Sequence, residues 1–252
     1  MKKLLAACLI FAFGIGAANA QHKVDSIKFY TEEYPPYNFS QNGQLRGIFI
    51  DIFAEMMKRL KARTTVSDVT MSEWAPAYAK ALAGPNIGLF CMTKTEARTP
   101  LFKWVGPITP TTIAVISQKG KQLPGLHNMI RDNSVRGFNA SVILNDIGHT
   151  KAREIGIPES NIISCTDIAD CIKDLESGRT QFLIYEENVG KWFLKNAGVG
   201  DRYETVATLQ RSLLSFAFSM DVDDELIDQM QEIIDEMKEE GLIDQIRNRY
   251  TN

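Results

Sequence analysis

Beyond its N-terminal region, the sequence lacks any apolar run long enough to cross a bilayer. It also lacks a cluster of basic residues, and the formal net charge of its 252 residues is −3 at pH 7. A mildly acidic chain without a basic run argues against nucleic acid or an anionic membrane surface as a partner. We therefore expect a soluble chain that buries a substantial core, as one large domain or as two smaller ones.

Residues that bind metals or phosphates are also scarce. The chain has 3 histidines and 4 cysteines, with no Cys-x-x-Cys pair and no two histidines at helical spacing. It contains no glycine-rich phosphate loop, no dinucleotide-binding motif and no internal repeat. Hence the sequence predicts neither a metal site nor a cofactor.

The N-terminal region has the three parts of a secretory signal peptide. Two lysines precede an apolar stretch, which is followed by the small residues of Ala18-Asn19-Ala20. We therefore predict that residues 1–20 are removed and that the exported chain begins at Gln21. The alternative is a lipoprotein-type signal ending at Cys8, but it would leave about four apolar residues where ~7–15 are usual.

Three cysteines remain after removal of the signal peptide. Cys165 and Cys171 lie across an expected strand end and the start of a helix, where they either form a disulfide in an oxidising compartment or stay as buried thiols. Cys91 has no histidine near it in the sequence. We therefore expect Cys91 to be a packed residue rather than a nucleophile.

Apolar periodicity predicts an α/β chain in which strands and helices alternate. The expected strands cover residues 27–30, 65–69, 87–90, 113–116, 162–164, 182–185 and 213–218, with a further short strand at Val135. The expected helices cover residues 49–60, 167–175, 189–194, 226–237 and 242–250, and two more begin near Ser72 and Val142. In α/β proteins, ligand sites gather in the loops that follow strands.

The stretch from Leu89 to Pro100 follows an apolar strand and is the first candidate site. The hydroxyls of Thr93 and Thr95 and the backbone N–H groups of a helical turn suit an anion. Arg98 adds a planar guanidinium that can bind a carboxylate through two parallel hydrogen bonds. The alternative is a surface loop with a solvated arginine.

Aromatic residues mark two further loops. Tyr34 and Tyr37 lie in a proline-stiffened loop after the first expected strand, where they either line a pocket or pack on the core. We expect one of the two to pack on the core. Trp74 lies at the start of an expected helix, where it either faces a ligand or covers the core.

Two polar residues follow later strands. Ser141 stands where we predict a turn before the helix that begins near Val142, so its hydroxyl and the N–H groups after it also suit an anion. Glu186 follows the apolar strand 182–185, at a position where an α/β site holds a partner for a cationic group. The alternative is that Glu186 and Glu187 are a solvated acidic pair.

Several motifs occur in a characteristic order over nearly the whole exported chain. They are Tyr34-Pro35-Pro36-Tyr37, the segment from Gly43 to Ile52, the run from Thr93 to Arg98, Ser177-Gly178-Arg179 with an acid seven residues beyond the arginine, and Asp224-Glu225-Leu226 leading to Gly241-Leu242-Ile243-Asp244. In these motifs the chain resembles the extracellular solute-binding proteins, family 3, which are the periplasmic binding proteins of amino-acid ABC transporters.

The resemblance implies the type II periplasmic binding protein fold, in which two α/β lobes are joined by two crossing segments. Lobe one would comprise residues 21–109 and 212–252, and lobe two residues 110–211. The resemblance further implies a periplasmic monomer that binds an amino acid or a similar small carboxylate between the lobes and delivers it to an ABC permease in the inner membrane.

The same resemblance implies roles for individual residues. Arg98 would bind the carboxylate of the ligand, with Thr93 beside it. The main-chain carbonyl of Cys91 and the side chain of Glu186 would take the ammonium. The chain departs from the family pattern at Glu186, where Asp is usual, at Cys91, where Gly or Ser is common, and at Ala140-Ser141, which replaces Gly-Thr. These departures concern the ligand rather than the fold.

Two other functions are compatible with the resemblance. The fold also occurs in a periplasmic cyclohexadienyl dehydratase, in which a carboxylic acid donates a proton, and Glu186 or Glu187 is the candidate donor here. A ligand-sensing module that acts on a membrane kinase is the other alternative. Because the chain supplies binding groups without a recognisable catalytic motif, we expect a binding protein and not an enzyme.

Overall fold

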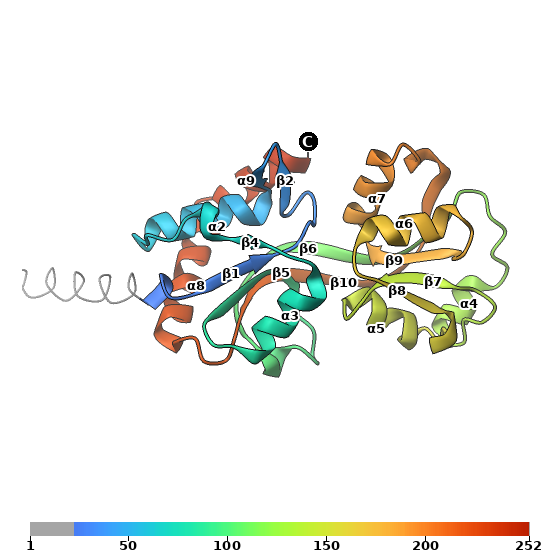
Figure 1. Ribbon diagram of the computed structural model, residues 1–252, viewed down its shortest axis with the longest axis horizontal. Coiled ribbons are helices and arrows are strands. Elements are labelled where there is room, and N and C mark those ends of the chain that lie inside the picture. The colour runs from blue at the N-terminus through green and yellow to red at the C-terminus, as the bar shows by residue number, and fades with distance from the viewer. Residues whose placement is uncertain (1–22, 252) are drawn as a thin grey trace, which may run out of the picture. The chain divides into compact units, whose positions relative to one another are not determined.

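Strands and helices alternate along the chain in the computed structural model (Figure 1), which confirms the predicted α/β class. The structure describes residues 23–251, so the predicted signal peptide lies outside the described residues. Within residues 23–251, every helix is too short or too polar to span a membrane.

The elements have the following bounds. The strands are β1 (Lys28–Thr31), β2 (Phe39–Gln41), β3 (Gln44–Arg46), β4 (Thr70–Met71), β5 (Ile87–Thr93), β6 (Lys103–Gln118), β7 (Ala140–Ile143), β8 (Ile162–Cys165), β9 (Phe182–Glu186) and β10 (Tyr203–Phe218). The helices are α2 (Ile48–Arg59), α3 (Trp74–Ala83), α4 (Leu126–Arg131), α5 (Ile147–Glu154), α6 (Ile168–Glu176), α7 (Glu187–Asn196), α8 (Asp224–Glu239) and α9 (Leu242–Thr251). Short 3-10 turns are η1 (Val66–Asp68), η2 (Thr99–Leu101), η3 (Glu159–Asn161) and η4 (Gly200–Arg202).

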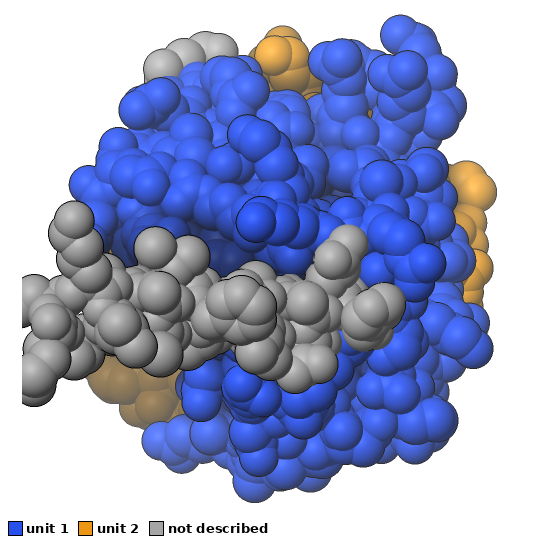
Figure 2. Space-filling model, turned by 90° about the vertical axis from the view of Figure 1, so that its left-hand side faces the viewer, with its two compact units in different colours: residues 1–72, 77–108, 215–252 blue, residues 73–76, 109–214 orange. Residues whose placement is uncertain are grey.

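The chain divides into two compact units, drawn in blue and orange in Figure 2. Among the described residues, unit 1 comprises residues 23–72, 77–108 and 215–251, and unit 2 comprises residues 73–76 and 109–214. Two strands of 16 residues each, β6 and β10, continue from one unit into the other. The chain therefore passes between the units along extended backbone.

Unit 1 is built on parallel strands with helices packed around them. β1 pairs in parallel with β4 and with β5, and β5 also hydrogen-bonds to β10. Every residue of β5 is buried, as expected for a central strand. Helix α2 packs against α8 and α9. The core of this unit includes a group of buried phenylalanines whose rings contact one another, namely Phe29, Phe49, Phe53, Phe90, Phe216 and Phe218.

Unit 2 has the strand order β6-β9-β7-β8. β7 pairs in parallel with β8 and β9, whereas β6 runs antiparallel to β9 with Ile113 opposite Glu186. Helix α5 contacts β7 and β9, and α6 contacts β7, β8 and β9. The parallel register brings the carboxyl ends of β7 and β9 to one edge of the sheet, and the side chains that end these strands lie there.

The prediction of a strand at residues 65–69 is wrong. Residues Val66–Asp68 form the 3-10 turn η1, and the strand is limited to Thr70–Met71. The Asp68 carboxylate accepts hydrogen bonds from the backbone N of Thr65 at 2.8 Å and from its hydroxyl at 3.0 Å. These local side-chain contacts favour a turn over extended pairing.

The prediction of a helix that begins near Val142 is also wrong. Val142 lies in the middle of β7, and α5 begins only at Ile147, with Asp146 as its N-cap. All four residues of β7 are buried between two parallel neighbours. A four-residue apolar run has no periodicity that separates a buried strand from a helix, so pairing with β8 and β9 decides the outcome.

Candidate functional site

Arg98 lies just beyond the carboxyl end of β5, the central strand of unit 1. Its backbone N donates hydrogen bonds to the Thr95 carbonyl and the Thr95 hydroxyl, both at 3.2 Å, which fixes the turn that presents its side chain. The side chain is nearly enclosed, because the residue is only 7% exposed. The chain thus holds a cation at a buried strand end.

The guanidinium of Arg98 is oriented by two neighbours. Its central carbon lies 5.2 Å from the centroid of the Tyr78 ring, and Nη1 lies 3.5 Å from the Thr93 carbonyl oxygen. A guanidinium over an aromatic face is stabilised by the ring quadrupole and keeps its planar edge in a defined direction. This arrangement suits a carboxylate that approaches along that edge.

Thr93 and Cys91 lie next to Arg98 on the last residues of β5. Each is 4% exposed. The parallel register pairs Tyr30 of β1 with Leu89 of β5, and the hydroxyl of Thr31 donates to the Phe90 carbonyl at 2.7 Å. The ends of β1 and β5 therefore lie side by side, at the edge where parallel sheets place their ligand sites.

Tyr34 and Tyr37 follow the end of β1, and both are buried at 3% exposure. Their ring centroids lie 5.5 Å apart with an interplanar angle of 31°. The Tyr34 backbone N donates to the Asn38 carbonyl at 2.6 Å, and the Tyr37 carbonyl accepts from Phe49 at 2.8 Å. The two rings form one packed aromatic pair in a loop that is tied to the start of α2.

Trp74 begins α3, and residues 73–76 belong to unit 2. The Trp74 side chain is buried, and its Nε1 donates a hydrogen bond to the Asn145 carbonyl at 3.1 Å. The indole is therefore positioned by the loop that precedes α5. The sequence gives no signal for this partner, because 71 residues separate the two in the chain.

Glu186 is the last residue of β9 and is completely buried. Its Oε2 accepts a hydrogen bond from the Val189 backbone N at 2.8 Å, so Glu186 is the N-cap of α7. Its Oε1 has longer contacts of 3.4 Å with the Thr112 backbone N and with the Asn188 side-chain amide. The Oε2 atom of Glu186 is thus engaged in capping α7.

The turn expected at Ser141 is absent, because Ser141 lies within β7. Its hydroxyl hydrogen-bonds to the Thr180 hydroxyl at 2.9 Å, and the residue is completely buried. The loop before α5 instead contains Asn145 and Asp146. An Asn-Asp pair before an apolar residue is an N-cap signal, and it was available in the sequence.

The thiols of Cys165 and Cys171 are free in the structure, and both residues are buried. The hydrogen bond with Cys165, together with burial, raises the pKa of the Cys171 thiol above its ordinary value. The disulfide that the sequence left open is therefore not formed here. Cys91 is also buried and takes part in no disulfide.

Comparison with known proteins gives one family. Residues 27–252 match the model of the bacterial extracellular solute-binding proteins, family 3. No curated protein matches the sequence.

Solved structures give a consistent picture of the fold. The chain is similar to a histidine kinase sensor domain with similarity to periplasmic binding proteins, with a TM-score of 0.77 and 17% identity over 90% of this chain and 96% of that chain. It is similar to the substrate-binding protein of an amino acid ABC transporter, with a TM-score of 0.71 and 17% identity over 90% and 99% of the two chains. It is also similar to an ancestral amino-acid-binding protein that is a precursor of cyclohexadienyl dehydratase, with a TM-score of 0.72 and 19% identity over 93% and 98%. The chain therefore has the periplasmic binding protein fold that we predicted.

Proposed function

Because the chain belongs to the bacterial extracellular solute-binding proteins, family 3, we propose that it binds an amino acid or a similar small carboxylate in the periplasm. In this proposal a monomer, freed of residues 1–20, delivers the solute to an ABC permease in the inner membrane. Residues 21–109 and 212–252 form one lobe of the receptor, and residues 110–211 form the other.

The position of Arg98 is the observation that supports this proposal most directly. Arg98 is only 7% exposed, and its guanidinium, which lies over the Tyr78 ring beyond a strand end, suits a planar anion. Its orientation is fixed before binding, so little conformational entropy is lost when a carboxylate arrives. We assign the ligand carboxylate to Arg98 and Thr93.

The second half of the proposal concerns a ligand ammonium. Glu186 uses Oε2 to cap α7, and we assign the ammonium to its Oε1, which lies 3.4 Å from the Thr112 backbone N and from the Asn188 side-chain amide. The main-chain carbonyl of Cys91 is a second acceptor. Tyr34, Tyr37 and Trp74 are proposed as apolar walls of the same site. Ser141 is proposed as a further residue of the site, because a hydroxyl that shares one hydrogen bond with Thr180 retains a further hydrogen-bonding position.

A dehydratase is the second candidate, favoured by the likeness to the cyclohexadienyl dehydratase precursor. It would need a protonated carboxyl group as general acid. Burial raises the pKa of Glu187, but hydrogen bonds from Lys191 and Thr205 outweigh it and leave the pKa below its ordinary value. The lowered pKa of Glu187 favours its carboxylate form, so binding without turnover agrees better with this group.

A sensor module is the third candidate, since a histidine kinase sensor domain shares the fold. The ligand groups proposed above serve a sensor and a transport receptor equally. The two differ in whether cells that lack this chain lose uptake of the solute. That loss is our expectation for a transport receptor.

A thermal-shift screen of the exported chain tests the proposal. Amino acids and small carboxylates should be screened singly, because a ligand that binds only the native state raises the unfolding midpoint by mass action. We expect at least one α-amino acid or small carboxylate to raise the midpoint in a concentration-dependent way. Isothermal calorimetry then gives the affinity, and a prephenate turnover assay on the same sample tests for dehydratase activity. Turnover, or the absence of any stabilising solute, would overturn the proposal.

A further inference from the structure

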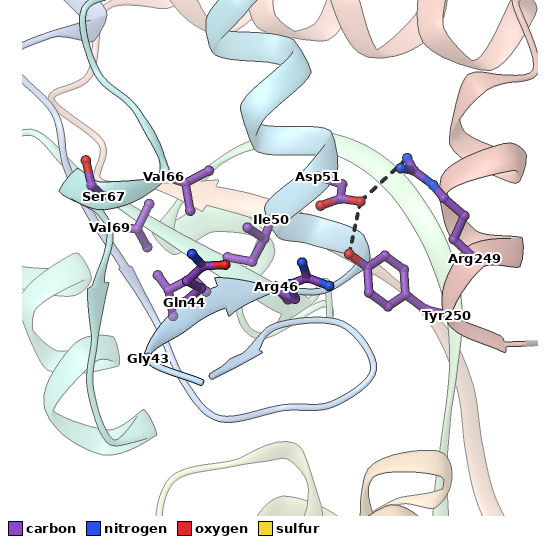
Figure 3. Close-up of a pocket in the computed structure, with 11 residues that line it drawn as sticks. Gly43, Gln44, Arg46, Ile50, Asp51, Val66, Ser67, Val69, Arg249 and Tyr250 are labelled. Carbon is purple, nitrogen blue, oxygen red and sulfur yellow. Dashed lines mark hydrogen bonds and ion pairs between the residues drawn. The ribbon is translucent and has the colours of Figure 1, made fainter. Parts of the chain in front are cut away.

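A pocket lies within unit 1 and shares no residue with the proposed solute site. It has a volume of about 900 Å³. Figure 3 shows it between the β2–β3 hairpin, the first turn of α2, the 3-10 turn η1 and the end of α9. Its lining residues are Gly43, Gln44, Leu45, Arg46, Ile50, Asp51, Val66, Ser67, Val69, Arg249 and Tyr250. A pocket of this volume is in the range that holds small organic ligands.

The charged lining of this pocket is mostly cationic. Arg46 and Arg249 contribute two guanidinium groups, and Asp51 contributes a single carboxylate. Asp51 is already engaged, because its Oδ2 accepts from the Tyr250 hydroxyl at 3.0 Å and lies 3.5 Å from Nη2 of Arg249. Figure 3 shows this carboxylate between the Tyr250 and Arg249 side chains. The acid is therefore largely compensated within the pocket.

Arg46 is the remaining charge of the lining. It extends from β3 and is exposed. Among the contacts described for residues 23–251, its side chain has no ion pair and no hydrogen bond. The lining thus contains one uncompensated guanidinium, from β3, and a second, from α9, whose side chain is 61% exposed. Guanidinium groups suit an oxyanion because each can donate two parallel hydrogen bonds.

The apolar part of the lining is formed by Leu45, Ile50, Val66 and Val69. Val69 and Ile50 are at least nine-tenths buried, whereas Leu45 and Val66 are partly exposed. The turn η1 replaces a strand at this point, and this keeps Val66 beside the pocket. An apolar body of a few carbon atoms would be desolvated against these side chains.

We propose that this pocket is a binding site for a small organic anion, with a carboxylate or phosphate group held by Arg46 and Arg249 and a short apolar body against Leu45 and Val66. The site is separate from the solute site that contains Arg98. It is therefore independent of the proposed function, and either proposal can fail without the other.

Chemical-shift titrations of the exported chain, labelled with 15N, test the proposal. The probes are hexanoate, hexyl phosphate, 1-hexanol and inorganic phosphate, which separate the anionic group from the apolar body. We expect hexanoate or hexyl phosphate to shift amides of β3, η1 and α9 and to bind at least about tenfold more tightly than either 1-hexanol or inorganic phosphate. Equal affinity for all four probes, or shifts confined to other elements, would overturn the proposal.

Single variants test the two arginines. Arg46→Ala should weaken binding of the better probe by about tenfold or more, because it removes a charge-assisted hydrogen bond. Arg249→Ala should weaken it less, since this guanidinium already lies near Asp51. Arg131→Ala is the matched control, because Arg131 is a surface arginine of unit 2 whose side chain is 70% exposed and pairs with Asp132. Unchanged affinity in Arg46→Ala, or an equal loss in Arg131→Ala, would overturn the assignment.

A gain of affinity provides a test that misfolding cannot mimic. Asp51→Asn keeps an acceptor for the Tyr250 hydroxyl and removes the negative charge beside Arg249. We expect about two- to fivefold tighter binding of the anionic probe, in line with the energy of a partly exposed ion pair. Arg98→Ala decides whether hexanoate occupies the solute site instead. Loss of hexanoate binding in Arg98→Ala, or no gain in Asp51→Asn, would contradict the proposal.

Discussion

Glu186 caps the helix that follows it, with Oε2 accepting a hydrogen bond from the Val189 backbone N at 2.8 Å. A residue that was singled out as a ligand candidate thus also has a structural role in α7. The two roles use different oxygens in our proposal. They can be separated by substitutions that keep the acceptor or remove it.

We predict that Glu186→Gln folds with a small loss of stability and that Glu186→Ala loses about 1 kcal/mol or more. The amide oxygen of Gln can still accept from Val189, whereas Ala removes the cap and leaves a buried N–H without its acceptor. Urea unfolding measures both. If the cognate solute carries an ammonium, calorimetry should also show weaker binding to Glu186→Gln, because the charge is lost.

Asp167 provides the matched control for Glu186. It is the N-cap of α6 and accepts from the Asp170 backbone N at 2.9 Å, so Asp167→Asn makes the same change of charge at another cap of unit 2. Solute affinity should be unchanged in Asp167→Asn. An ammonium-bearing solute that binds Glu186→Gln as tightly as the native chain would contradict the role of Oε1.

Arg98→Ala should weaken binding of the cognate solute by roughly 30- to 5,000-fold, equivalent to about 2–5 kcal/mol. The physical reason is that the ligand carboxylate would lose its two-hydrogen-bond partner in a site with little solvent. Arg98→Lys keeps the charge but not the planar fork, so it should restore only part of the affinity. Calorimetry with the solute identified in the screen provides the measurement.

Arg131→Ala removes an exposed guanidinium of unit 2 and should leave solute affinity unchanged. Thermal unfolding of each variant shows whether it is folded. A folded Arg98→Ala variant with native affinity would mean that the solute is held elsewhere.

Much of the α/β pattern could be predicted from the sequence, and so could the positions of two candidate ligand-binding residues near the ends of strands. Apolar runs mark β5 and β9, and polar residues lie at or beyond the end of each run, so the strand-end positions of Arg98 and Glu186 could be predicted from the sequence. The family is confirmed by the match over residues 27–252. The lobe boundaries and the roles of the ligand residues stay predictions.

The parts that could not be predicted depend on contacts between distant residues. Tyr78 beneath Arg98 has no local signal, because its position follows from how α3 packs on unit 1. The burial of Ser141 in β7 depends on pairing with β8 and β9. The capping role of Glu186 was missed because a carboxylate after a strand was interpreted as a ligand group, although the same position is an N-cap of the next helix.

The cysteine pair gives a prediction about thiol reactivity. In unreduced protein, an alkylating reagent should label Cys91, Cys165 and Cys171 after denaturation and label them slowly in the native state. The native thiols are buried, and the raised pKa of Cys171 keeps it from forming the reactive thiolate. Mass spectrometry counts the labels. A single label on denatured, unreduced protein would show that Cys165 and Cys171 are bridged after export.

His149 connects the start of α5 to the loop before it. The Nδ1 atom of His149 accepts a hydrogen bond from the Asn145 backbone N at 3.3 Å. The carbonyl of Asn145 in turn accepts a hydrogen bond from Nε1 of Trp74. Burial, and then the positive charge of Arg153, lower the pKa of His149 below its ordinary 6.5, although Glu159 and Asp146 oppose the change. The neutral ring is therefore the form that fits the folded chain.

We predict that the chain loses stability as the pH falls from about 7 to 5, in part through His149. The pKa of His149 is lowered in the folded state, so below pH 6.5 the unfolded chain binds more protons than the folded chain. The contribution of the neutral ring to the unfolding free energy is therefore present above pH 6.5 and is lost as the pH falls through the folded-state pKa of His149. One such group changes the unfolding free energy by at most about 1.4 kcal/mol per pH unit. His149→Asn keeps an acceptor for Asn145 without a titrating ring, so urea unfolding should show a weaker pH dependence. His127→Asn, at an exposed histidine of α4, is the control and should retain the native dependence of the unfolding free energy on pH. If His149→Asn shows a dependence as steep as that of the native chain, the role of His149 is contradicted.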